Sequence, residues 1–316
     1  MNITTSVLPA AVQISYNGKL LAFEQPDLIH GLFADRKRMP KNAGEIFRMR
    51  RMAKLKTALV PLGNSGITPP GQTLSAVDID AKIEHYGTWL SINEQVTLTS
   101  EDPILNEAAK RLGIALRETE DELLSSMLAT TASQINCTGG VSGDSPTEIT
   151  RSDVDTIVRT LKNASAKMIS DNIEAEDKFA TAPVRQAYWA LCSTQLIGNL
   201  EQIGGFIPAA SYPNTTRALQ SEWGSASNIR YVVSALGSVS PLASANGFDI
   251  YNIFNVAKES YAYIEQDAAT ATFIYTPPQI AGGPLALNST CGFKFASACK
   301  VTYDIWLINQ RATRLN

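Results

Sequence analysis

Residue types that usually perform enzymatic chemistry are scarce in this sequence. It contains two histidines, His30 and His85, and four cysteines that form no Cys-x-x-Cys pair and have no metal-ligand spacing. None of the common motifs of serine hydrolases, zinc peptidases or phosphate-binding loops occurs. His85 lies on the apolar phase of a predicted strand, where we expect it to be packed rather than catalytic. We therefore predict no catalytic, cofactor-binding or metal-binding residues, and a protein that is not an enzyme.

Charge is distributed unevenly along a chain that is nearly neutral as a whole. With 44% hydrophobic residues, 18% charged residues and a net charge of −3, the chain is typical of a folded protein and shows no global preference for nucleic acid. One stretch is strongly basic and another is acidic. The basic residues are Arg48, Arg50, Arg51, Lys54 and Lys56, and the acidic ones are Asp171, Glu174, Glu176 and Asp177.

These two stretches have two possible roles. Opposite charges on neighbouring copies of the chain would set the register and orientation of an assembly. Part of the basic stretch must instead pair across its own hairpin with Asp78, Asp80 and Glu84. The sequence leaves the division between these roles open.

Residues 41–93 have the pattern of one very long β-hairpin. Apolar and charged residues alternate along both arms, which is typical of half-buried strands, and the segment 62–72 between them is rich in Gly, Pro and Asn. Arms of roughly 18 residues would extend about 60 Å, further than a compact domain of this size requires. We expect another copy of the protein to cover the apolar face, which carries Phe47, Met49, Val77, Ile79 and Ile83.

The apolar phase of the return arm changes near Gly87. Apolar residues occupy odd positions up to Ile83 and even positions afterwards, at Leu90 and Ile92. An extra residue in one strand, a β-bulge, produces such a shift. We predict a bulge at Gly87 that acts as a hinge.

The rest of the chain predicts an α+β fold. A helix over about 102–131 has an apolar stripe that we interpret as core, formed by Leu105, Ala109, Leu112, Leu116, Leu123 and Met127. A second helix begins after Ser152, and a third opens at Pro183 and includes Tyr188 and Leu191. Beyond residue 204, short strands are predicted at 229–234, 249–256 and 270–275, with a closing pair at 293–300 and 301–310. No apolar run approaches the roughly 20 residues of a membrane span.

This order of elements resembles the major capsid protein of tailed phages, the Hong Kong 97-type fold, and most of all the capsid family of the N-four-like podophages. The segments that carry the resemblance are GEIFRMRRMAKL, PLGNSGITPPGQTLS, HYGTWLSINE, DPILNEAAKRLG, SEWGSASNIRYVVS and GFKFASACKVTYDIWLINQ. The resemblance implies an N-terminal arm (1–40), an extended β-hairpin loop (41–93), a peripheral domain with the long spine helix (94–203, with further strands from 291–316) and an axial domain (204–290).

The resemblance also implies a function and partners. The protein would self-assemble, as hexamers and pentamers, into an icosahedral shell around double-stranded DNA that it binds without sequence specificity. Portal, scaffolding and decoration proteins would be further partners, no membrane would be involved, and the shell would assemble in the host cytoplasm as the virion capsid. Two alternatives stay open: the shell of an encapsulin-like nanocompartment, and a DNA-binding module that uses the basic stretch Arg36–Lys56.

Overall fold

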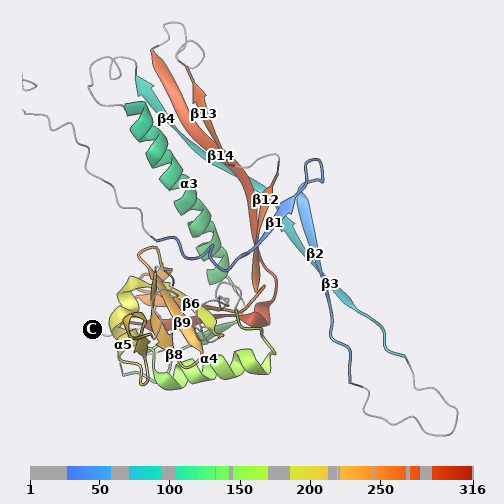
Figure 1. Cartoon of the computed structure of the whole chain (residues 1–316), viewed down its shortest axis with the longest axis vertical. Helices are drawn as coiled ribbons and strands as arrows, with labels where there is room; N and C mark the ends of the chain where they lie inside the picture. The colour runs from blue at the N-terminus through green and yellow to red at the C-terminus, as the bar shows by residue number, and fades with distance from the viewer. Residues whose placement is uncertain are drawn as a thin grey trace, which may run out of the picture.

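A long helix beside an extended sheet stands above a rounded lobe, and a hairpin leaves the other side of the sheet (Figure 1). This arrangement comes from a computed structural model, which describes residues 27–57, 71–93, 104–131, 133–141, 145–169, 186–212, 219, 221–244, 247–267, 271–277 and 287–314. Strands dominate over helices, and the two kinds of element occupy separate stretches of the chain. The prediction of an α+β fold is confirmed.

The rounded lobe is built on an eight-stranded sheet with the order β5-β15-β11-β6-β9-β8-β7, in which β10 also pairs with β11. Every residue of β6, β9 and β11 is buried. Strands that are buried on both faces read as continuous apolar runs, because each face must pack against another layer. The strands are β5 (Gln134–Asn136), β6 (Tyr188–Ser193), β7 (Ile207–Pro208), β8 (Glu222–Ala226), β9 (Ile229–Ser234), β10 (Val239–Ser240), β11 (Ile250–Val256) and β15 (Leu307–Thr313).

Helix α4 (Arg151–Asn163) covers one face of this sheet. Its buried residues Val154, Ile157 and Leu161 belong to the same core as Tyr188 of β6 and Tyr231 of β9. Short helical turns complete the lobe: η2 (Thr194–Leu196), α5 (Ile197–Glu201), η3 (Ala209–Ser211) and η6 (Asp304–Trp306).

Two predictions about helices are wrong. The predicted third helix is strand β6, because an apolar run such as YWALCS fits a buried strand as well as a buried helix, and here β9 and β11 flank it. The second helix begins two residues earlier than predicted, with Thr150 and not Ser152 as its cap. The Asp153 carboxylate accepts hydrogen bonds from the Thr150 backbone N–H at 3.0 Å and its hydroxyl at 2.6 Å.

The extended sheet is organised around one long strand, β14. Its order is β1-β12-β14-β13, and β4 pairs with the other side of β14. The β4–β14 ladder runs without interruption from Asn93↔Asn288 to Glu84↔Ser297. The strands are β1 (Asp35–Met39), β4 (Glu84–Asn93), β12 (Tyr261–Gln266), β13 (Thr272–Thr276) and β14 (Asn288–Val301).

The long helix α3 (Ile104–Ala129) packs along one face of the extended sheet, as predicted for the apolar stripe of this segment. Leu112, which is 3% exposed, packs with Phe293 and Phe295 of β14. Towards the end of the helix the buried positions are Leu124 and Leu128, whereas the predicted Leu123 and Met127 are only partly buried. The stripe therefore turns by one residue where the helix passes from the extended sheet to the lobe.

Strands β2 (Ile46–Met52) and β3 (Ala76–Lys82) form the hairpin, with pairs from Ile46↔Lys82 to Met52↔Ala76. The pairing agrees with the predicted alternation, but the return arm does not continue to residue 93 as part of the hairpin. After Ile83 the chain enters β4 and pairs with β14. The tip at 58–70 lies outside the described residues.

The predicted bulge at Gly87 is absent. Residue pairs follow one another without a shift through Gly87↔Lys294. The change of apolar phase occurs instead at Ile83, which lies between β3 and β4 and belongs to neither strand. Glycine is required at position 87 for another reason: a Cβ there would meet the backbone oxygen of Phe293 at 2.6 Å.

Strand pairing also crosses the predicted domain boundary at residue 204. β6, from the segment 94–203, lies in the lobe sheet between β9 and β11. β12 and β13, from the segment 204–290, lie in the extended sheet. The chain passes between the two sheets several times, so continuous segments do not follow them.

Alanine substitution at two glycines should have opposite effects on stability. Gly87→Ala should destabilise the fold by about 1–3 kcal/mol, because the added methyl group overlaps the backbone of β14. Gly113→Ala, in α3 with no atom near the added methyl group, should stabilise it by about 0.5–1 kcal/mol through helix propensity. Chemical denaturation checks both values, and equal effects would contradict the close approach at Gly87.

Candidate assembly surfaces

The root of the hairpin, which is the end that carries Phe47, Met49, Ile79 and Ile83, packs against other parts of the same chain. Met49 and Ile83 are 7% and 8% exposed and pack against Ile264 of β12 and Ala296 of β14. Phe47 and Ile79 are partly buried against the same cluster. The prediction that a second copy covers Met49 and Ile83 is therefore wrong, because β4 draws the root of the hairpin onto the extended sheet.

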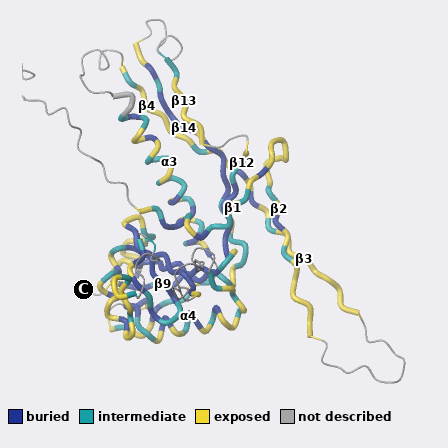
Figure 2. Tube along the Cα trace, in the orientation of Figure 1, coloured by how far each residue is buried: buried dark blue, intermediate teal, exposed yellow. Residues whose placement is uncertain are grey.

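The outer half of the hairpin is exposed, as the yellow segments in Figure 2 show. It carries four large apolar side chains that are each close to half exposed or more: Met52 (55%), Leu55 (52%), Leu74 (62%) and Val77 (46%). They do not share one face, because Val77 pairs with Arg51 on the face of Met49, whereas Met52 lies on the face of Arg48 and Arg50. Exposed apolar groups on a projecting element mark an interaction surface. We name these four residues the outer patch.

Two of the basic residues pair within the hairpin, on the face opposite Met49. Arg48 donates to both carboxylate oxygens of Asp80 at 2.7 and 2.8 Å. Arg50 donates to Asp78 at 2.8 and 3.3 Å. These hydrogen bonds are the main reason that the pKa values of both aspartates lie below their usual range, and the positive charge of the arginines is a smaller one. Arg48 and Arg50 thus hold the two strands together, which weakens the alternative of a DNA-binding stretch.

The remaining basic residues differ from this pair. Arg51 lies on the other face, where its guanidinium stands 4.5 Å from the ring centre of Tyr303 and donates to the Thr302 carbonyl at 3.2 Å. Lys54 and Lys56 are exposed beyond the end of the strand ladder. The predicted acidic partner stretch, Asp171, Glu174, Glu176 and Asp177, lies outside the described residues.

The two histidines lie in different environments. His30 is fully buried; its Nδ1 lies 2.7 Å from Asp121 Oδ2, and its backbone N–H donates to Asp121 Oδ1 at 2.8 Å. Tyr261 donates its hydroxyl to the His30 carbonyl at 2.7 Å, so the residue ties the segment before β1 to α3 and β12. His85 is exposed on β4, and the prediction that it is packed is wrong.

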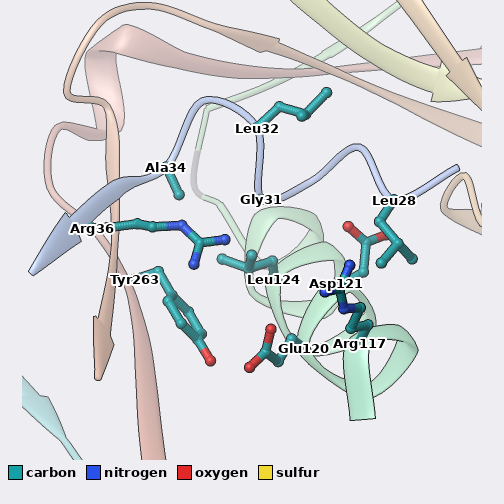
Figure 3. A pocket seen from close by; sticks show the side chains of 10 residues that line it. All are labelled: Leu28, Gly31, Leu32, Ala34, Arg36, Arg117, Glu120, Asp121, Leu124 and Tyr263. Atoms are coloured by element: carbon teal, nitrogen blue, oxygen red, sulfur yellow. The ribbon is translucent and has the colours of Figure 1, made fainter. Parts of the chain in front are cut away.

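A cavity of about 350 Å³ opens beside this tie (Figure 3). Arg36, Glu120 and Tyr263 line it, together with the outer part of Asp121. Arg36 pairs with Glu265 at 3.2 Å, and burial raises the pKa of Glu120. Two arginines, Arg36 and Arg117, and two carboxylates, Glu120 and Asp121, line the cavity, so its lining favours neither sign of ligand charge.

The described residues contain no group of histidines, cysteines and carboxylates able to hold a metal ion. Within the same residues, no helix has the length and apolar character needed to cross a bilayer.

Two methionines on β2 offer a matched test of the hairpin root. Met49→Ala should lower stability by about 2–4 kcal/mol, because it leaves a cavity against β12 and β14. Met52→Ala, at a residue 55% exposed, should change stability by less than about 0.5 kcal/mol. Denaturation midpoints measure both effects, and a small effect at Met49 would show that the root is not packed on the sheet.

Acid should loosen the hairpin through its aspartates. A carboxylate with a lowered pKa stabilises the fold above its ordinary pKa of about 4, and this contribution is lost as the pH falls through the lowered value. Relative to the intrinsic exchange rate, which itself falls towards acid pH, amide exchange in β2 and β3 should therefore rise selectively below about pH 4. In an Asp78→Asn, Asp80→Asn variant, exchange should already be faster at neutral pH and lack this step. An identical acid response in both proteins would contradict the assignment.

Comparisons with known proteins agree with this architecture. The capsid of Ralstonia phage GP4 matches with a TM-score of 0.70 and 11% identity, over 100% of this chain and 99% of that chain. The capsid of cyanophage Pam1 matches with a TM-score of 0.69 and 13% identity, over 99% and 98%. The head of Helicobacter pylori bacteriophage KHP40 matches with a TM-score of 0.63 and 10% identity, over 100% and 98%. Identities this low establish the fold alone.

Sequence comparison adds the family. No curated protein matches the chain. A family model described as phage capsid protein matches residues 76–275, which is more than half of the sequence. The chain belongs to the phage capsid protein family.

Proposed function

We propose that this structural protein is the major capsid protein of a tailed phage, and that its copies assemble as hexamers and pentamers into an icosahedral shell around double-stranded DNA. Membership of the phage capsid protein family supports a structural role in the phage head. The observation that carries the assembly mode is the outer patch. It lies on a hairpin that points away from the body of its own chain (Figure 1) and remains exposed there.

In this proposal the outer half of the hairpin lies on a neighbouring copy, over the face built by its long helix and extended sheet. The root, with Met49 and Ile83 buried, fixes the direction in which the hairpin leaves its own chain. Obligate interfaces bury upwards of about 2,000 Å², and the hairpin alone would be marginally stable in water. Assembly would therefore order the element that mediates it.

The parts of the fold receive roles on the same basis. Helix α3 would be the spine helix, and it would form the peripheral domain together with the extended sheet. The rounded lobe around β6, β9 and β11 would be the axial domain near the symmetry axes. These roles follow the two sheets rather than the continuous segments 94–203 and 204–290.

Contact with the packaged genome would be weak and independent of sequence. The chain has a net charge of −3, and two of its clustered arginines are neutralised by aspartates. Strong binding of phosphate would hinder both the entry and the release of DNA. Portal, scaffolding and decoration proteins would be the further partners of such a shell.

Electron microscopy of the purified protein tests the assembly. The wild-type chain should form closed, uniform particles, whereas a stable monomer at high concentration would contradict the proposal. Val77→Glu should abolish particles while circular dichroism stays unchanged, because residue 77 is 46% exposed in the single chain but would be buried between copies. Val77→Thr, which keeps the branched shape without a charge, is the matched control and should still assemble.

A further inference from the structure

Strand β4 has an open edge that no described strand occupies. Its ten residues, Glu84–Asn93, pair with β14 along one side only. Eight of the ten residues are exposed, and Tyr86 and Ile92 are intermediate. In Figure 2 most of β4 is yellow, although it belongs to the same sheet as the largely buried β14. An edge of this length presents a row of backbone N–H and C=O groups to a further strand.

Natural sheets usually protect their edges, and β4 lacks four of the usual devices. Protection comes from short strands, lysines, prolines or bulges. β4 is long, contains no lysine, arginine or proline, and pairs without a bulge. From Tyr86 onwards it carries no charged residue.

The other edges of the same sheet differ: β1 is protected by charge, whereas β13, on which Phe273, Ile274 and Tyr275 are exposed, is protected only by its smaller length. β1 has the sequence DRKRM, in which four of five residues are charged. β13 has only five residues and is followed by Pro277. The contrast within one sheet indicates that the edge of β4 is kept available for pairing.

Side chains beside this edge would suit an uncharged strand. Trp89 is 67% exposed, on the face away from α3, and lies against Gly292, where a Cβ would come within 2.8 Å of the Trp89 Cβ. Leu90, on the other face, is 43% exposed. An added strand would cover part of both side chains.

The N-terminal segment of the chain has the matching properties. Residues 1–26 lie outside the described part of the structure. Residues 2–18 contain no charged residue and no histidine. Within them, Val12, Ile14 and Tyr16 alternate with Gln13 and Ser15, and Asn17-Gly18 follows, which is the pattern of a strand that ends in a tight turn.

We propose that residues 12–16 of one copy add as a strand to the open edge of β4 on a neighbouring copy. This pairing rests on the proposed function, because copies must lie side by side in a shell for the segment to reach the edge. Ten residues, 17–26, lie between Tyr16 and Asp27, and the eleven steps from one Cα to the other span at most about 35–40 Å. Backbone hydrogen bonds would supply the affinity, and the uncharged alternating pattern the specificity.

Hydrogen exchange on assembled shells of the full chain tests the pairing. In wild-type shells the outward-facing amides of about five consecutive residues of β4 should exchange slowly, because the five-residue segment 12–16 bonds that part of the open edge. Ile14→Pro removes a donor and fits poorly within a strand, so the outward-facing amides of β4 should exchange about tenfold faster or more, while those of β14 stay unchanged. Ala10→Pro, outside the pairing residues, is the control and should behave as wild type.

Two results would overturn the proposal: outward amides of β4 that exchange fast in wild-type shells, or exchange that Ile14→Pro leaves unchanged. Neither is confused with failure of the proposed function, which would show as an absence of closed particles from the wild-type chain.

Photocrosslinking identifies the strand and the copy from which it comes. Trp89→p-benzoylphenylalanine places a reactive aromatic group at an exposed position without assuming a register. In shells mixed from ¹⁴N- and ¹⁵N-labelled copies, crosslinked peptides should join residue 89 to residues 1–26 across the two labels. Crosslinks to another segment, or only within one copy, would contradict the proposal.

Discussion

One buried junction holds the parts of this chain in place. Ile29 and Phe33, which precede β1, pack there with Leu128 of α3, Phe254 of β11 and Tyr261 of β12. The junction joins the two sheets, the long helix and the residues directly before β1 in one apolar core. Asp121 adds polar contacts there, since it bonds both the ring Nδ1 and the backbone N–H of His30. Loss of this core would separate the extended sheet from the lobe.

The extended sheet fixes the position of the hairpin relative to the junction. β12 leaves the junction and pairs with β14, which in turn pairs with β4 over ten residues. The apolar face of β12 and β14 receives Met49 and Ile83, so the root of the hairpin cannot rotate freely. Exposed large apolar residues lie at the outer end of the ladder (Val77 and Met52) and beyond it (Leu55 and Leu74). A rigid root with an uncovered outer half is the arrangement expected of an element that binds a neighbouring copy.

Much of this architecture was predictable from local patterns. Alternation identified the pairing face of β2 and β3, and the stripe through Leu112 identified α3. Both patterns have a period set by backbone geometry, so they survive any tertiary context. The prediction of a helix over Tyr188–Ser193 was wrong, because a run that is apolar on both faces has no period that distinguishes a strand from a helix. The prediction of a bulge at Gly87 was wrong, because a change in the apolar alternation locates the end of a strand only approximately. Strand β3 ends directly before Ile83, which lies between β3 and β4.

By itself, the sequence determined the α+β class, the hairpin, the long helix and the lack of recognisable catalytic motifs, because each depends on neighbours along the chain. Tertiary structure alone decided which residues of the hairpin are available. Arg48 and Arg50 are bound by Asp80 and Asp78, and Met49 is covered in part by β12 and β14, which lie more than 200 residues further on. It also decided that one edge of β4 is closed by β14, while no other described strand pairs with the second edge. Pairing of strands that are distant in sequence leaves no local signal, because it depends on which faces meet when the whole chain packs.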